Sequence, residues 1–262
     1  MTSKKHLIIL ILFFSNVLIS CAQSSDNHSP FSTPKEKWVM PTKLEEISGL
    51  AWHSENTLAC VNDEKGNIYL YDLVKKEVTK KIKFGKDADY EGITYRAPYF
   101  YVISSKGKLH IVNEKTQEVT KIQLPFTIDN DIEGLCFYDQ SHLLVALKGK
   151  GGINGEKADY KAIYKVNMED YNDVSLAFTL PKGNKLSPSA VYFDQSKQLV
   201  YVLSHRSGEL FIINATSKEI INTHNLPRKN FPQPEGICIS PNGRLFISTE
   251  KGDQFSARIL EF

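Results

Sequence analysis

Two short stretches of the sequence carry acidic residues in the same pattern and could hold a cation. DADYEGITY spans Asp87 to Tyr95, and DNDIEGLCF spans Asp129 to Phe137. Both read Asp-x-Asp-x-Glu-Gly before an apolar residue, and carboxylate oxygens are preferred ligands of Ca²⁺. The pattern leaves two alternatives, a calcium loop or a structural repeat that carries carboxylates.

The EF-hand form of a calcium loop does not fit either stretch. Its twelfth position requires a bidentate acid, and counting from Asp87 and Asp129 gives Pro98 and Gln140 there. The flanking residues also alternate as strands do, whereas an EF-hand needs helices. The repeat is therefore the better explanation of the pattern.

Self-similar segments recur about 42 to 56 residues apart along the chain. Each begins with an apolar run entered by a small residue: ISGLAW, YEGITY, IEGLCF, PSAVYF and PEGICI. A second and a third apolar run follow within each unit, separated by turn residues, and most units end in a shorter fourth run. Four short strands per unit without a long helical pattern predict an all-β fold, a β-propeller.

We predict a five-bladed propeller, with six blades as the alternative. The last unit ends at Phe262 after its third run, and an unassigned run, KEKWVMP, lies at Lys35 to Pro41. An N-terminal strand that completes the last blade would close the ring and remove an open sheet edge. The propeller domain would then occupy residues 36–262, with an enlarged loop at 148–162 in the third unit.

The up-and-down order of strands in a blade predicts which polar residues share a face. The entry to each first strand and the turn between the second and third strands lie at the same end. The entries contribute Ser48, Glu91, Glu133, Ser189 and Glu235, and the turns contribute Asn62, Asp63, Glu64, Ser104, Ser105, Lys148, Ser204, His205, Thr249 and Glu250.

Three glutamates around one channel mouth would repel one another. The repulsion is relieved if one glutamate is protonated, if a base such as Lys148 intervenes, or if a cation binds. We favour Ca²⁺, with Glu91, Glu133 and Glu235 as ligands and Asn62 or Asp63 assisting. The alternative is that each glycine permits a tight turn into the strand, while each glutamate is solvated or bonds to neighbouring backbone.

Other chemistries have little support in the sequence. The chain has no Gly-x-Ser-x-Gly elbow, His-Glu-x-x-His or Cys-x-x-Cys. His205 is the one histidine of the proposed face and is a candidate general base, although a solvated loop histidine is the alternative. Cys60, Cys136 and Cys238 lie in apolar runs, and we expect them to be buried thiols.

The N-terminus predicts export and lipid anchoring. Lys4 and Lys5 precede the apolar run Leu7 to Phe14, and Leu-Ile-Ser is followed by Cys21, which is similar to the lipobox of bacterial lipoproteins. We expect a signal peptide at 1–20, a lipid on Cys21, a flexible tether to residue 35, and a location in the cell envelope, at the inner or the outer membrane. Loss of residues 1–20 leaves 30 basic and 30 acidic residues, which gives no electrostatic case for nucleic acid.

The runs ISGLAW, NTLACVNDEKGNIYLYD, DYEGITY, IEGLCFY, PSAVYFD and PQPEGICISPNGRLFISTE resemble the SdiA-regulated (YjiK-like) family. The resemblance implies an envelope β-propeller from about residue 38 onward. The fourth entry departs from the family's motif, since it reads Ser187-Pro188-Ser189-Ala190. The layout is more distantly similar to calcium-dependent lactonase propellers, in which inner-strand acids hold a metal.

We therefore expect a lipid-anchored, monomeric propeller that binds a small molecule or an envelope protein on an acidic, calcium-binding face. The alternative is a calcium-dependent lactonase or esterase that uses the same face, with His205 as its base.

Overall fold

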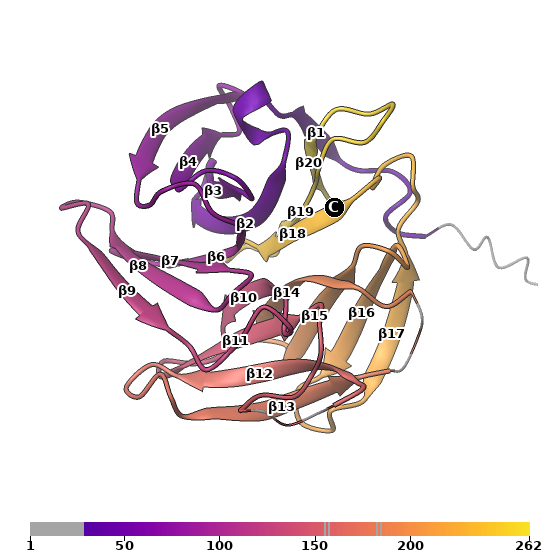
Figure 1. Cartoon of the computed structure of the whole chain (residues 1–262). Helices are drawn as coiled ribbons and strands as arrows, with labels where there is room; N and C mark the ends of the chain where they lie inside the picture. Colours follow the sequence, from indigo (N-terminus) through magenta and orange to yellow (C-terminus); the bar gives the residue numbers. More distant parts are fainter. Residues whose placement is uncertain (1–28, 155, 157, 182, 184) are drawn as a thin grey trace, which may run out of the picture.

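The computed structural model describes residues 29–154, 156, 158–181, 183 and 185–262. Within them, strands form five separate antiparallel sheets of four strands each, arranged around one axis (Figure 1). The only helix described is a single 3₁₀ turn, η1 (Thr42–Leu44). No helix in this part of the chain is long and apolar enough to cross a membrane.

Each sheet is one blade, and its first strand in the list that follows lies nearest the axis. Blade 1 consists of β2 (Ile47–Ser54), β3 (Thr57–Asn62), β4 (Asn67–Asp72) and β5 (Glu77–Lys83). Blade 2 consists of β6 (Tyr90–Arg96), β7 (Tyr99–Ser104), β8 (Lys108–Asn113) and β9 (Val119–Gln123). Blade 3 consists of β10 (Ile132–Phe137), β11 (His142–Leu147), β12 (Lys161–Asn167) and β13 (Val174–Leu180).

Blade 4 consists of β14 (Pro188–Asp194), β15 (Leu199–Ser204), β16 (Glu209–Asn214) and β17 (Ile220–Asn225). Blade 5 consists of β18 (Pro234–Ile239), β19 (Leu245–Thr249), β20 (Arg258–Glu261) and β1 (Glu36–Val39). The inner strands contact one another in the closed order β2, β6, β10, β14, β18 and β2 again. Five blades are therefore confirmed, and the six-bladed alternative is wrong.

The two ends of the chain meet in blade 5, where β1 pairs antiparallel with β20 and places Trp38 opposite Ile259. Trp38 also packs in the core between blades 5 and 1, and its Nε1 donates a hydrogen bond to the carbonyl of Leu73 in blade 1 at 2.8 Å. The predicted closure by an N-terminal strand is present in the structure.

The hydrophobic core is divided into five clusters, and each fills the space between two neighbouring blades. Between blades 1 and 2, for example, Val61 and Ile68 pack with Phe100 and Val102. Alternate residues of each strand point to opposite faces of its sheet. One face of a blade therefore contributes to the cluster on one side, and the other face contributes to the cluster on the other side. Cys60, Cys136 and Cys238 are buried in these clusters as free thiols, as predicted.

The predicted signal peptide and Cys21 lie outside the described residues. The predicted tether is too long at its C-terminal end, because the chain packs on the propeller from Ser29 onward. Phe31 is buried against Phe262 and His224, and Ser29 donates to the carbonyl of Asn225 at 2.6 Å. The chain packs earlier than predicted because burial of the apolar Phe31 ring removes it from water, which is favourable.

Candidate functional site

A β-bulge at the start of every inner strand positions the predicted ring of residues. The register shifts between Ile47 and Gly49 in blade 1, and equivalent shifts occur in the other four blades. The residue inside each bulge has no partner in the ladder, and a bulge redirects the side chain that it carries. These five residues are the predicted ring: Ser48, Glu91, Glu133, Ser189 and Glu235.

Four of the five bulges are followed by a glycine and that of blade 4 by Ala190, and the glycine is required by close packing, not by a turn. A Cβ on Gly134 would lie 2.7 Å from the backbone nitrogen of Val191 in the next blade, and one on Gly236 would lie 2.8 Å from the Cβ of Leu50. Neither glycine has a positive φ. The expectation that these glycines permit a tight turn is therefore wrong, because the inner strand of the neighbouring blade fills the space.

The two serines of the ring join neighbouring blades. Ser48 Oγ donates to the carbonyl of Tyr90 at 2.6 Å, and Ser189 Oγ donates to the carbonyl of Pro234 at 2.6 Å. Both serines are buried. Their hydroxyl hydrogens are thus committed to the scaffold, and three glutamates remain as the polar groups that face the mouth.

We call Glu91, Glu133 and Glu235 the central carboxylates, and Lys148 is the main positive charge among them. The Lys148 ammonium forms an ion pair with Glu133 Oε1 and lies 3.6 Å from Asp131 Oδ2. Burial alone would lower the pKa of Lys148, but Glu133 and Asp131 outweigh it and raise the pKa. Glu133 is 4% exposed, and burial raises its pKa to about 8 although Lys148 acts in the opposite direction.

Backbone hydrogen bonds fix Lys148 and the start of the enlarged loop next to the entry of β10. The Lys148 backbone nitrogen donates to the carbonyl of Asp131 at 2.8 Å, and Asn130 Nδ2 donates to the carbonyls of Lys150 and Gly152 at 3.0 and 2.7 Å. The beginning of the loop is thus fastened to the segment that leads into β10. The backbone bond of Lys148 recurs in the other blades at Asp63, Ser105, His205 and Glu250, so Lys148 occupies a position that every blade directs toward the mouth.

Glu235 is paired with the predicted base. The Nδ1 atom of His205 lies 3.0 Å from Glu235 Oε1, and Glu235 is 7% exposed. Burial raises the pKa of Glu235 to about 8, and Asp63 contributes to the rise. Burial also lowers the pKa of His205, with further contributions from Arg228 and Lys148. The pair therefore holds the imidazole in one orientation, and the lowered pKa favours its neutral form.

Protonation of Glu91 removes its repulsion with the other central carboxylates. Burial, the charge of Glu133 and a hydrogen bond with Asp89 raise the pKa of Glu91 to about 11. Asp89 in turn accepts a hydrogen bond from the hydroxyl of Ser105. The three central carboxylates thus have three separate solutions to their repulsion: a proton, a lysine and a histidine. The cavity between them is about 10 Å³, roughly the space for one water or ion.

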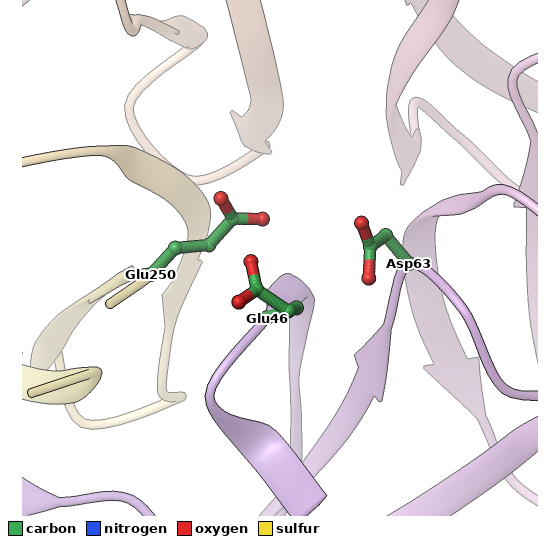
Figure 2. Close-up of side chains that lie close together, drawn as sticks. All are labelled: Glu46, Asp63 and Glu250. Carbon is green, nitrogen blue, oxygen red and sulfur yellow. The ribbon is translucent and has the colours of Figure 1, made fainter. Parts of the chain in front are cut away.

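A second group of carboxylates lies beside the mouth, and we call it the acidic cluster. It consists of Glu46 before β2, Asp63 after β3 and Glu250 after β19, and each contributes a ligand atom within 4.8 Å of the others. Figure 2 shows their carboxylates directed toward a common space from three separate segments. Among the described residues, no other group of three or more His, Cys, Asp or Glu side chains meets this spacing.

The acidic cluster is short of positive charge. Asp63 Oδ1 is buried without a hydrogen-bond partner. Burial raises the pKa of Asp63 to about 6, with Glu46 and Glu64 adding to the rise. Burial and the charge of Glu235 raise the pKa of Glu250 to about 9, and Gln233 Nε2 donates a hydrogen bond to Glu250 at 2.6 Å.

The predicted ligands are thus distributed over two places. Asp63 belongs to the acidic cluster, the three glutamates form the central carboxylates, and Asn62 serves neither. Asn62 Oδ1 accepts from the backbone nitrogen of Lys65 at 3.0 Å, so it stabilises the turn after β3. The role of the predicted residues as calcium ligands stays a prediction.

Sequence reasoning missed Glu46 and placed Glu250 on the face without a role. The available signal for Glu46 was its position two residues before Ser48, directly ahead of the first entry.

The comparisons with known proteins agree with the fold. The sequence matches the SdiA-regulated family over residues 32–255. No curated protein matches the chain. Among solved structures, the fold is similar to a glutaminyl cyclase of Myxococcus xanthus, with a TM-score of 0.65, 12% identity, and coverage of 87% of this chain and 94% of the other.

Two further structures are similar at lower scores. A nidogen/laminin complex gives a TM-score of 0.54, 12% identity, and coverage of 78% of this chain and 72% of the other. A streptogramin B lyase gives a TM-score of 0.51, 15% identity, and coverage of 87% and 72%. At these identities the likeness concerns the fold alone, whereas the family match spans most of the sequence. The chain is a member of the SdiA-regulated family.

Proposed function

We propose that this propeller is an envelope binding protein that holds Ca²⁺ in the acidic cluster and binds a ligand or protein partner on the same face. The observation that carries the proposal is the convergence of Glu46, Asp63 and Glu250 from three segments, with Asp63 Oδ1 buried and unpartnered. Such an oxygen is costly to bury unless a donor or a cation satisfies it. A hard cation with oxygen ligands suits three carboxylates.

The acidic cluster fits calcium better than the central carboxylates do. The central carboxylates already contain a paired lysine, a paired histidine and a protonated acid. The acidic cluster contains three carboxylates and no lysine or arginine within ion-pairing distance of them among the described residues. Because Ca²⁺ takes six to eight oxygens, three side chains would leave positions for water or for an oxygen of the ligand.

The test is calcium binding by titration calorimetry on metal-free protein, with matched variants. Glu250→Gln removes one ligand charge and is expected to weaken binding about tenfold or more. Glu77→Gln makes the same charge change at the exposed start of β5 and is expected to bind as the wild type does. Absence of calcium binding by the wild type, or equal loss in both variants, would remove the acidic cluster as the site.

A second candidate function rests on the pair of His205 and Glu235. Once Glu235 is ionised, above a pH of about 8, its carboxylate 3.0 Å from Nδ1 accepts a hydrogen bond from Nδ1 and leaves Nε2 free to act as a general base. This arrangement supports a calcium-dependent lactonase or esterase. His205→Gln would then abolish turnover of a lactone or an aryl ester, while calcium binding would be retained. Retained calcium with no turnover by the wild type would favour the binding protein.

The location of the protein is a separate part of the proposal. We propose that Cys21 carries a lipid that anchors the propeller to a membrane outside the cytoplasm. The basic and apolar segments that precede Cys21 in the sequence support lipid anchoring. In cells, the wild type is expected in the membrane fraction and to incorporate labelled lipid, and Cys21→Ala is expected to lose both properties. A membrane-bound, unlabelled wild type would show that the segment anchors without lipidation.

A further inference from the structure

Two sets of charged side chains lie over different blades of the face that carries the strand entries, among other charged residues such as Asp131 in blade 3 and Lys65 in blade 1. The acidic cluster comes from blades 1 and 5. Five basic side chains come from the third and fourth blades and the connection that follows them, and we call them the basic arc: Lys148, Lys161, His205, Arg206 and Arg228. Two of its members, Lys148 and His205, reach the central carboxylates. The other three lie further out.

Two of the three outer members of the basic arc, Lys161 and Arg228, donate to carbonyl groups and not to carboxylates. Lys161 Nζ donates to the carbonyl of Lys148 and to that of Gly149 at 3.1 Å. The Arg228 guanidinium donates to the carbonyls of Arg206 and Pro232 at 2.8 and 2.9 Å. Within the described residues, no carboxylate lies within 4.0 Å of the Lys161, Arg206 or Arg228 side chains.

The three outer members of the basic arc therefore carry positive charge that no neighbouring carboxylate among the described residues neutralises. Burial lowers the pKa of Lys161, and Arg206 and Lys148 lower it further against the effect of Asp131. Burial, Arg228 and Lys148 lower the pKa of His205, Arg206 adds to this, and Glu133 acts in the opposite direction.

Arg206 is the member best placed to meet a ligand. It is exposed, it lies in the turn between β15 and β16 next to His205, and its carbonyl is fastened by Arg228. A planar guanidinium can bind two oxygens of one carboxylate or phosphate at once.

We infer that the basic arc binds an oxyanion, a carboxylate or a phosphate group, of the ligand that this face receives. The inference rests on the proposed function, because it assigns the chemical class of the ligand expected on that face. The ligand's anionic end would lie over blades 3 and 4, and its remaining part would extend toward the acidic cluster.

The inference is tested by titrating the full-length protein with acetate and, separately, with inorganic phosphate at low ionic strength. The matched variants are Arg206→Gln in the basic arc and Lys218→Gln, which makes the same charge change in the turn between β16 and β17 at the other end of blade 4. We expect Arg206→Gln to weaken binding about five- to tenfold, and Lys218→Gln to leave it unchanged.

The two anions distinguish the possible groups. Tighter binding of phosphate than of acetate assigns a phosphate, and the reverse assigns a carboxylate. The inference is overturned if neither anion binds the wild type at millimolar concentrations, or if the two variants lose the same affinity.

Failure of this inference differs from failure of the proposed function. Anion binding that depends on Arg206 without any calcium binding would leave the basic arc in place and remove only the metal. Calcium binding that depends on Glu250 without any anion binding would remove only the basic arc. A variant with Arg206→Gln that melts as the wild type does would show that the change in anion binding is not a loss of folding.

Discussion

At the scale of single residues, burial gives neighbouring carboxylates different states. Glu91 retains its proton, Glu133 pairs with Lys148 and Glu235 pairs with His205, although all three occupy the same position in their blades. The repeat predicts that the glutamates converge, but it does not predict which partner each one finds. Lys148 and His205 occupy equivalent positions directly after the second strands of their blades, and the different residue types at this position break the symmetry of the ring.

Replacement of Glu133 separates the two possible cation sites. Glu133→Gln leaves the half-buried Lys148 ammonium without its main partner, so we expect a loss of about 2–4 kcal/mol in the free energy of unfolding. Calcium affinity is expected to change little, because the acidic cluster is intact. Chemical denaturation and calorimetry on the same variant measure the two effects. A large loss of calcium affinity in Glu133→Gln would show that Glu133 is a calcium ligand.

Calcium-free protein is expected to lose stability as pH rises from about 6.5 to 8. The folded-state pKa values of Glu235 and Glu250 lie at about 8 and 9, above the ordinary value for an unfolded chain. The native state therefore binds more protons than the unfolded state in this window, and the free energy of unfolding falls with pH. Below about pH 6.5, histidines with lowered pKa values act in the opposite direction.

The same pKa values predict proton release when calcium binds. At pH 7 the Glu250 carboxyl is protonated in the metal-free protein, and it must lose that proton to coordinate the ion. Calorimetric enthalpies in buffers of different ionisation heat should differ by about one proton per calcium. Buffer-independent enthalpies with tight calcium binding would show that Glu250 is not a ligand.

At the scale of elements, the sequence predicts the strands well because their signal is local. Each apolar run, turn glycine and closing strand can be recognised without knowing its neighbours, and the structure places blades and the β1 closure where the runs indicate. The acidic cluster is different, since Glu46 lies in the segment before β2 and Glu250 follows β19, at opposite ends of the chain. Only ring closure brings them together, and no local pattern carries that information.

The contact between inner strands makes a prediction about glycine. Gly134→Ala would place a Cβ 2.7 Å from the Val191 backbone nitrogen, so the strand must shift, and we expect a loss of about 1–3 kcal/mol in the free energy of unfolding. Gly183→Ala is the control, because its nearest atom would be 3.9 Å away. Urea denaturation compares the two variants. Equal stability of both would mean that β10 and β14 are not as close as the structure places them.

At the scale of the whole molecule, stability depends on closing the ring, because each of the five core clusters needs two blades. The cluster between blades 5 and 1 depends on β1, which brings Trp38 against Phe246 and joins it to Leu73. Without this strand, β20 would present an open edge to other molecules.

Replacement of two residues of β1 tests the closure. Trp38→Ala removes a buried ring and leaves the Leu73 carbonyl without its donor, so we expect a loss of about 3–5 kcal/mol in the free energy of unfolding. Val39→Ala changes a neighbouring side chain that is 57% exposed, and its effect should stay within about 0.5 kcal/mol. Urea denaturation gives both values, and size-exclusion chromatography shows whether loosening of β1 leads to association through β20. A Trp38→Ala protein as stable and as monomeric as Val39→Ala would show that the other four core clusters hold the ring closed without help from β1.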